Sequence, residues 1–352
     1  MRRILKRKRS LLILSLLISL VFVVSFVWKQ EWGKIGQAFR QANLFYMALS
    51  LVPMVLTYIF RVLRWRILML PVKALTFLQA LGAVLIAFTA NNVLPARIGE
   101  FVRPAIIKVR YEKSFTATFA TVAVERLLDL VALGVILGYV CIFWPIPLHG
   151  GGGETPGAGG FDAVKAGVFL VVMIGGALAF VLVMRLWPER VKRLVAWQRT
   201  LLKLVDSFVV GLKFIDNLRH VILTLLYSLL VWAMAALSMY FSALAFGLTI
   251  TYPGACMSLL CVALAVAIPQ GPAFVGTFHW ASQLAMQMLG NAAAPSASFG
   301  IQAHAVAVLP VTLCGLIALW RMGLSLGQIR RQAEAAEKEA GEEAKSTDEK
   351  PT

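Results

Sequence analysis

The chain has 352 residues, of which 59% are hydrophobic and 14% charged, and its mean hydropathy is +0.79. This composition excludes an ordinary soluble domain and indicates an integral membrane protein. The formal net charge is +17, but the basic residues gather at the ends of apolar runs, as the positive-inside rule predicts, and this argues against nucleic-acid binding. The runs are long enough for spanning helices, so we expect an all-α polytopic fold.

The first two apolar runs, 10–28 and 44–63, predict two full spans. Basic residues precede the first run and no small-residue cleavage site follows it, so we expect a retained signal-anchor helix with a cytoplasmic N-terminus. The second run ends at Arg61, Arg64 and Arg66. We interpret these arginines as positive-inside anchors. The alternative is that Arg61, which shares a helix face with Trp65, contacts lipid headgroups at the cytoplasmic mouth.

The third apolar run, 75–94, is followed by a polar segment that proline and glycine interrupt. A full crossing would leave a strongly basic stretch outside, against the positive-inside rule. We therefore expect a re-entrant hairpin that enters from the cytoplasm and turns at 91–99, where broken backbone is tolerated inside protein or beside water. The alternative is a cytoplasmic loop that begins earlier than the hydropathy indicates.

This polar segment also holds candidate binding residues. Arg97, Glu100 and Arg103 are spaced three apart, so on a helix that restarts near Pro95 they would form an Arg–Glu–Arg ladder. Two arginines against one carboxylate leave a net positive site, to which Asn92 adds an amide. Because the planar guanidinium binds phosphate through two hydrogen bonds, the pattern favours a phosphate-bearing lipid.

The next run, 115–144, predicts a span that carries three charges. Glu125 and Asp129 lie one helical turn apart, and Arg126 can reach Asp129, which leaves Glu125 without a partner on this helix. One interpretation is a polar cavity wall, in which arginine binds an anionic headgroup and a carboxylate takes up a proton. The other is a structural ion network that holds helices together.

The second half of the chain predicts the remaining elements. A glycine-rich stretch at 149–160 reads as an external linker, and 163–184 as a span. We expect 185–219 to be a cytoplasmic amphipathic helix on an anionic leaflet, the alternative being a solvated connector. Two further spans are expected at 220–246 and 299–320.

Between the last two spans, 255–290 predicts a second hairpin that enters from the outside. It turns at a Pro/Gly-rich segment where Gln270 and Gly271 would close the other side of a cavity. The total is about six full spans plus two re-entrant hairpins in one transmembrane domain, 1–325, with both termini cytoplasmic; eight ordinary spans are the alternative. The charged tail, 326–352, is expected to be disordered.

Motifs of soluble-enzyme chemistry are missing from the sequence. It contains no Walker loop, HExxH, GxSxG or dinucleotide fingerprint, so we expect no cofactor and no metal. The four cysteines are expected to be small apolar side chains of the spans. The four histidines show no pairing at helical spacing.

Four short motifs together resemble the lysylphosphatidylglycerol synthetase transmembrane-region family of flippase-like proteins, over roughly 10–325. They are Arg61-x-x-Arg64-Trp65, Asn92-x-Leu94-Pro95-x-Arg97-x-Gly99-Glu100-x-x-Arg103, Glu125-Arg126-x-x-Asp129 and Pro269-x-Gly271. The resemblance implies a membrane domain that moves an aminoacylated phospholipid, with relatives in glycolipid, dolichol-phosphate sugar or hopanoid pathways. It departs from full synthetases because the large soluble aminoacyl-transferase domain is missing.

Three functions follow as hypotheses. The first is translocation of a phosphate-bearing or anionic lipid headgroup across the cytoplasmic (inner) membrane, with Arg97, Arg103 and Arg126 holding the phosphate and acidic residues gating. The second is an integral-membrane transferase that uses Glu125 or Glu100 as a base. The third is an accessory protein that recruits a separate lipid-modifying synthase or glycosyltransferase.

Overall fold

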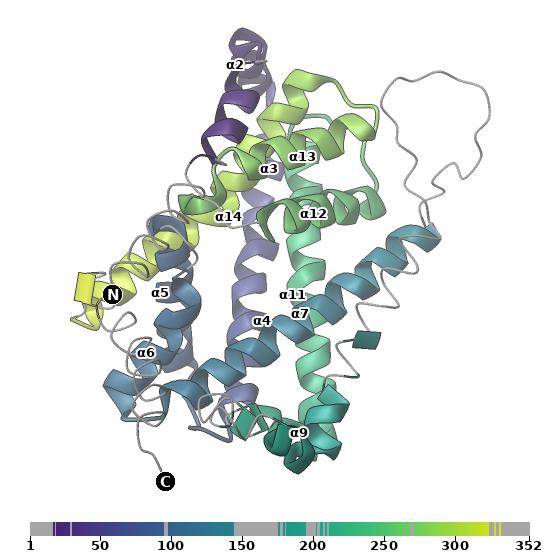
Figure 1. Cartoon of the computed structure of the whole chain (residues 1–352). Coiled ribbons are helices and arrows are strands. Elements are labelled where there is room, and N and C mark those ends of the chain that lie inside the picture. The colour runs from purple at the N-terminus through teal and green to yellow at the C-terminus, as the bar shows by residue number, and fades with distance from the viewer. Residues whose placement is uncertain are drawn as a thin grey trace.

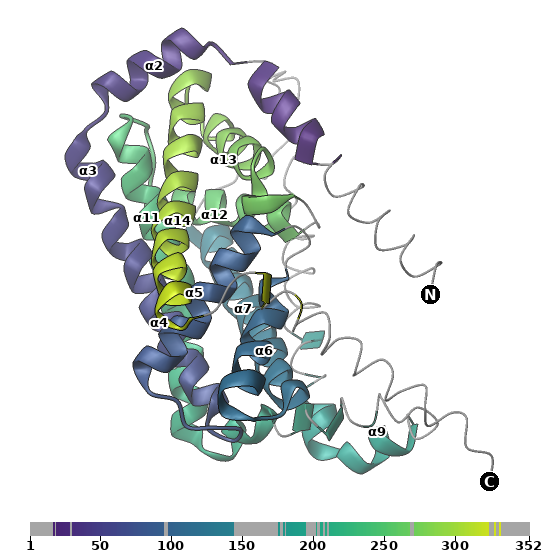
Figure 2. The ribbon, with the colours of Figure 1, turned by 90° about the vertical axis from the view of Figure 1, so that its left-hand side faces the viewer.

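The computed structural model describes residues 17, 19–28, 30–94, 98–143, 175–176, 179, 181–194, 202, 205–206, 208–209, 211–267, 271–323, 327–328 and 331. All regular structure in these residues is helical (Figures 1 and 2). After a short apolar helix, Ser19–Trp28, the elements are α2 (Trp32–Gln41), α3 (Leu44–Leu49), α4 (Leu51–Met69), α5 (Phe77–Val93), α6 (Gly99–Tyr111), α7 (Phe115–Phe143), α9 (Pro188–Leu194), η2 (Leu212–Asp216), α11 (Leu218–Ala245), α12 (Tyr252–Ala267), η3 (Pro272–Phe274), α13 (Thr277–Met288) and α14 (Ala293–Arg321).

Four helices of the described residues are long and apolar enough to cross a membrane: Leu44–Met69, which comprises α3 and α4, and α7, α11 and α14. They match the spans predicted at 44–63, 115–144, 220–246 and 299–320, and they confirm a polytopic helical membrane protein. The helix Ser19–Trp28 lies within the first predicted span. The span predicted at 163–184 falls mostly outside the described residues.

The second span is longer than predicted, because α4 continues to Met69. Arg61 and Arg64 therefore lie inside the helix and are buried, so the interpretation of these two residues as positive-inside anchors at the end of a span is wrong. The helix can continue because other helices supply partners for both guanidinium groups. Between the first two predicted spans lies α2, an amphipathic helix with Ile35 buried.

Both predicted hairpins appear as pairs of shorter helices in contact, α5 with α6 and α12 with α13. The first pair is closed by Asn91, whose side-chain oxygen accepts a 2.8 Å hydrogen bond from the backbone N–H of Gly99. The short α5 begins with a capping box between Thr76 and Gln79. Return of each pair to its own side of the membrane stays a prediction.

Helix α14 connects the two pairs, since α5 and α13 both pack against it. Figures 1 and 2 show them beside different parts of α14. On α5, Thr89 donates a 3.2 Å hydrogen bond to the carbonyl of Val311. On α13, Ser282 lies against Gly300, where a Cβ atom would approach its hydroxyl to 2.6 Å. The two helix pairs thus share one long helix as their support.

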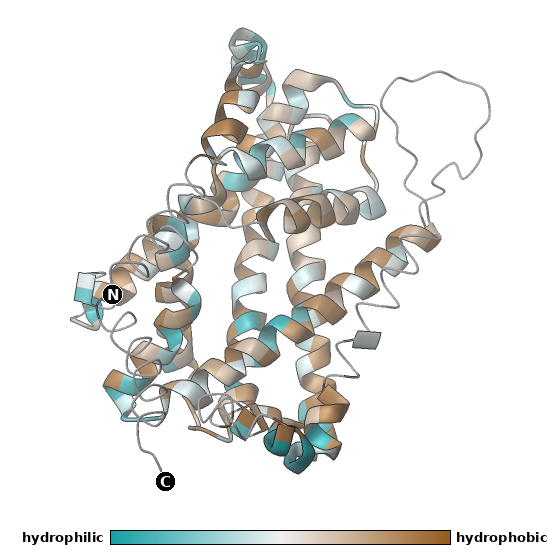
Figure 3. Ribbon diagram, in the orientation of Figure 1, coloured by the Kyte–Doolittle hydropathy of each residue, from teal (hydrophilic) through white to brown (hydrophobic). Residues whose placement is uncertain are grey.

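The cytoplasmic amphipathic segment predicted at 185–219 is described only in part. Helix α9 begins at Pro188, a residue that is favoured at the first position of a helix. At the other end, Leu212 and Phe214 of η2 are buried in a core that also contains Trp65. This end therefore packs against the protein rather than on a lipid leaflet. Hydropathy differs along the long helices, as Figure 3 shows. These helices are largely hydrophobic, but hydrophilic residues interrupt α7 within its length.

Candidate functional site

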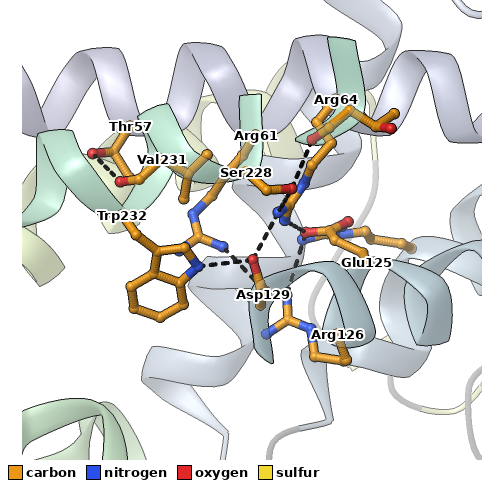
Figure 4. A network of polar contacts seen from close by, with 11 residues as sticks. Thr57, Arg61, Arg64, Glu125, Arg126, Asp129, Ser228, Val231 and Trp232 are labelled. Carbon is orange, nitrogen blue, oxygen red and sulfur yellow. Dashed lines mark hydrogen bonds and ion pairs between the residues drawn. The ribbon is translucent and has the colours of Figure 1, made fainter. Parts of the chain in front are cut away.

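A buried ion network forms where α4, α7 and α11 meet (Figure 4). Arg64 of α4 is fully buried and points between the two carboxylates of α7. It donates hydrogen bonds to Asp129 Oδ1 (2.7 Å) and Glu125 Oε1 (2.9 Å), and a third to the Ser228 hydroxyl of α11 (2.9 Å). One guanidinium therefore ties three long helices together, with both carboxylates on the face of α7 that their spacing predicted.

The second carboxylate oxygen of Glu125 receives its hydrogen bond from the first helix pair. Arg103 of α6 donates a 2.6 Å hydrogen bond to Glu125 Oε2. Its guanidinium also lies over the rings of Trp65 and Phe88, at 5.4 and 5.6 Å from their centroids. The expectation that Glu125 has no partner on its own helix is corrected, because Arg126 donates a 3.3 Å hydrogen bond to Glu125 Oε1. Arg64 and Arg103 reach Glu125 from two other helices.

Asp129 has a hydrogen-bond partner at only one of its two carboxylate oxygens, unlike Glu125. Its Oδ1 atom accepts hydrogen bonds from Arg64 and from the indole N–H of Trp232 (3.0 Å). Its buried Oδ2 atom has no hydrogen-bond partner in the described part of the chain. Two guanidiniums approach that oxygen, Arg126 at 3.3 Å and Arg61 at 4.0 Å. The predicted Arg126–Asp129 pair is thus present, but it is loose.

These contacts divide the arginines into two groups. Arg64 and Arg103 make short hydrogen bonds and balance the two carboxylates. Arg61 and Arg126 remain as a formal surplus of +2 in this six-residue cluster, and both reach the same oxygen of Asp129. The Arg61 guanidinium lies between aromatic rings, 5.3 Å from Phe88 and 5.5 Å from Trp232. Such a pair of weakly held cations is suited to an anion that binds and leaves.

Arg126 gives the cluster access to the surface, since its side chain is 40% exposed. It lines a small pocket together with Glu100 and Arg103. Counting Glu100 as ionised, four arginines face three carboxylates, so the site keeps a formal charge of +1. The pocket wall also includes Asn91 and Gly99, the two residues that close the α5–α6 turn.

The other predicted residues are distributed as follows. The ion pair of Arg103 is with Glu125 rather than within the predicted Arg97–Glu100–Arg103 ladder, and Arg97 lies outside the described residues. Asn92 faces α14, where its side chain donates a 2.9 Å hydrogen bond to Thr312. The N–H of Gly271 donates to the hydroxyl of Ser19 (2.7 Å). Gln270 lies outside the described residues.

Sequence reasoning missed three contributors. Asn91 hydrogen-bonds to Gly99, whereas the sequence predicted its neighbour Asn92 as a site residue. Ser228 and Trp232 lie one turn apart on α11, and each reaches the ion network. A serine in an apolar span carries no distinctive signal. The described residues contain no group of three or more histidine, cysteine, aspartate or glutamate side chains that could hold a metal ion.

Comparison with known proteins places these residues in a family. A short match to glycosyltransferase AglD of Haloferax volcanii covers 61 residues at 39% identity, which is 17% of this chain and 10% of that protein. The family model described as the lysylphosphatidylglycerol synthase TM region matches residues 12–315, nearly the whole chain and all of the ion network. The protein is therefore a multi-pass membrane protein that belongs to the lysylphosphatidylglycerol synthase TM region family.

Proposed function

We propose that this protein translocates a phosphate-bearing lipid headgroup across the cytoplasmic membrane, and that Arg61 and Arg126 bind the phosphate. The observation that carries the proposal is the loose contact of both guanidiniums with one carboxylate oxygen that accepts no hydrogen bond. A phosphate would replace Asp129 as their partner and would leave them to it again on release. Binding that is reversible in this way suits transport, in which the headgroup must also leave the site.

Arg64 and Arg103 have a different role in this proposal. Their short hydrogen bonds to Glu125 and Asp129 fix α4, α6 and α7 around the site. Removing a buried charged group strands its partners, so these two arginines are positioning residues. The charges on α7 thus belong both to a structural ion network, which Arg64 and Arg103 complete, and to a headgroup-binding site, which Arg61 and Arg126 complete.

The helix pairs give the proposed route its geometry. Short segments interrupted by proline and glycine, one in each half of the chain, are typical of the midplane binding sites of transporters. The pocket that Arg126 lines also includes Asn91 and Gly99, which are hydrogen-bonded to each other at the α5–α6 turn. The headgroup would pass through a polar groove at this turn, while the acyl chains stay in the bilayer. We propose cytoplasmic positions for both termini, from the distribution of basic residues.

The test is headgroup movement in proteoliposomes that contain the purified protein. The panel of labelled lipids comprises anionic phospholipids, aminoacylated phospholipids and polyprenyl-phosphate sugars. Arg126→Gln and Arg61→Gln keep a polar side chain without the charge. Arg40→Gln, an exposed position on α2, is the matched control. We expect movement of at least one phosphate-bearing lipid, lost in both site variants and kept in the control. Equal movement in Arg126→Gln and in the unaltered protein would contradict the assignment.

The short match to a glycosyltransferase favours a second candidate, an accessory subunit or transferase that acts on a lipid-linked sugar. The two candidates differ in where the product lies. If the site variants make the glycolipid but leave it on the original leaflet, translocation is the function. If the glycolipid is never made, the transferase or accessory function replaces the first proposal.

A further inference from the structure

Two half-buried histidines lie side by side where the second helix pair packs against α14, away from the arginine network. His279 of α13 and His304 of α14 have ring centroids 4.5 Å apart. Aromatic rings surround them, with Phe26 at 5.2 Å from His279 and Phe278 at 5.2 Å from His304. The residues are 25 positions apart in the sequence, so helical spacing gave no sign of the pair.

Backbone groups of one turn define the hydrogen-bonding role of one nitrogen in each ring. The Nε2 atom of His304 lies 2.7 Å from the carbonyl oxygen of Ala273. Because a carbonyl only accepts, this nitrogen carries the hydrogen. The N–H of Gly276 donates to Nδ1 of His279 at 3.2 Å, so that nitrogen carries none. The segment 271–276 is therefore held at two points by the two rings.

The turn adopts a backbone that its residues disfavour. Ala273 and Phe274 have φ angles of 53° and 58°, in the left-handed region that non-glycine residues rarely occupy. Gly276 has a φ angle of 89°, and a Cβ atom there would meet the backbone nitrogen of Val23 at 2.6 Å. Strained backbone persists only where its surroundings hold it, and it is frequent in segments that switch between conformations. The two histidine contacts are part of what holds this turn.

The pair lies deep within a helix that can cross the membrane. His304 lies about 16 Å along α14 from Ala293, well inside a helix long enough to span the membrane. Ionisable side chains at such positions commonly mark ion or proton paths. Protonation of either ring would also act on the turn, because each ring bonds to it.

The elements packed around the pair offer it no carboxylate. Helices α2, α4, α5, α11 and α12 contain neither aspartate nor glutamate, and the same holds for Ser19–Trp28, α13 and α14. Tyr58 of α4 donates to the carbonyl of Ala307, one turn after His304. The titratable or charged side chains of these elements are Lys34 and Arg40 on α2, Tyr58, Arg61, Arg64 and Arg66 on α4, Arg219, His220, Tyr227 and Tyr240 on α11, Tyr252, Cys256 and Cys261 on α12, and Cys314 and Arg321 on α14.

We propose that His279 and His304 form a proton-binding site whose occupancy sets the conformation of the turn 271–276. A proton added to His304 makes its bond to Ala273 charge-assisted and tightens the turn. A proton added to Nδ1 of His279 removes the acceptor for Gly276, and the charge would lie at the positive end of the α13 dipole. Two imidazolium rings at this separation repel each other, so the pair holds one proton.

The proton site connects to the arginine network through α5. Helix α5 packs against η3 in the turn, and its Phe88 lies over both Arg61 and Arg103. A change in the turn can thus bias the position of α5 and the phosphate-binding groups beside it. The role of the proton in driving lipid movement rests on the proposed transport function. The proton site itself does not.

The experiment measures the turn directly. Val275, which is 42% exposed, is replaced by cysteine in a protein whose four native cysteines are serine. The rate at which a methanethiosulfonate reagent labels this cysteine is followed in proteoliposomes from about pH 8 to about pH 4. A separate Trp320→Cys protein, in which the cysteine is exposed, measures how the reactivity of a thiol itself changes with pH. His279→Asn keeps an acceptor in the place of Nδ1, and His304→Gln keeps a donor in the place of Nε2. His220→Gln is the matched control.

We expect a labelling rate that changes with pH as a single-proton curve in the unaltered turn and in His220→Gln. The curve should be lost in His279→Asn/His304→Gln. A curve that persists in the double variant, or a rate that never depends on pH, would overturn the proposal. The outcome is separable from transport: a pH-dependent turn without lipid movement refutes only the transport function, and lipid movement with a pH-independent turn refutes only the proton site.

Discussion

Replacing Arg64 by methionine is the most direct test of how the ion network supports the fold. The guanidinium is fully buried and makes three hydrogen bonds, to Asp129, Glu125 and Ser228. Methionine keeps much of the volume but removes a guanidinium that hydrogen-bonds to both buried carboxylates, which leaves Glu125 with Arg103 and Asp129 with Trp232. Removing one partner of a buried ion pair costs about 3–5 kcal/mol. Total stabilities are about 5–15 kcal/mol, so we expect a substantial loss of folded protein.

The contrast with Arg126 gives this prediction its specificity. The Arg126 side chain is 40% exposed and its contacts with Glu125 and Asp129 are both 3.3 Å long. Both carboxylates are buried, but each keeps shorter hydrogen bonds from other side chains. The long Arg126 contacts are thus expected to contribute about 0–1 kcal/mol, the range of exposed ion pairs. We therefore expect Arg126→Met to fold nearly as well as the unaltered protein, even though it should lose translocation. Arg64→Met should thus lower the stability of the fold, whereas Arg126→Met should abolish transport with little effect on stability.

The assay is unfolding of purified protein in mixed micelles with increasing dodecyl sulfate, followed by circular dichroism. Arg40→Met, at an exposed position on α2, is the control. A double variant, Arg64→Met/Asp129→Asn, completes a thermodynamic cycle, and contacting residues should deviate from additivity by about 0.5–3 kcal/mol. If Arg64→Met loses no more than about 1 kcal/mol, the network does not hold the helices and the division of the arginines is wrong.

Three further predictions concern the first helix pair and its support. In Gly99→Ala a Cβ atom would collide with the carbonyl of Ala87, so α5 and α6 should separate and stability should fall by about 1–3 kcal/mol; unchanged unfolding would show that this contact is not fixed. In Gly315→Ala a Cβ atom would lie 2.6 Å from the carbonyl of Leu85, and the same unfolding assay should report a similar loss, with normal behaviour refuting tight packing of α5 on α14. In a protein without native cysteines, Leu94→Cys should react with an impermeant thiol reagent from the cytoplasmic side, and reaction from the outside alone would exclude the proposed hairpin.

The second span is longer than its hydropathy indicates, because buried arginines near its end have partners on another helix. Three arginines close together, at positions 61, 64 and 66, read as the cytoplasmic end of a span, because charge is normally placed in water. The structure continues α4 through them to Met69. Two carboxylates of α7 compensate the buried charge, and these lie more than 60 positions away in the sequence. A local average of hydrophobicity has no access to such a partner.

The sequence by itself determined what depends on local composition and spacing. Apolar length predicted the four long helices, and proline and glycine predicted two pairs of shorter ones, since backbone interruptions are local. Spacing of four placed Glu125 and Asp129 on one face of α7. Tertiary structure alone decided which residues are partners. Arg64 and Arg103 hydrogen-bond to Glu125, Arg61 and Arg126 both approach Asp129, and the ring of His279 packs against that of His304. These contacts join residues of separate helices, and distance along the chain carries no information about which helices pack together.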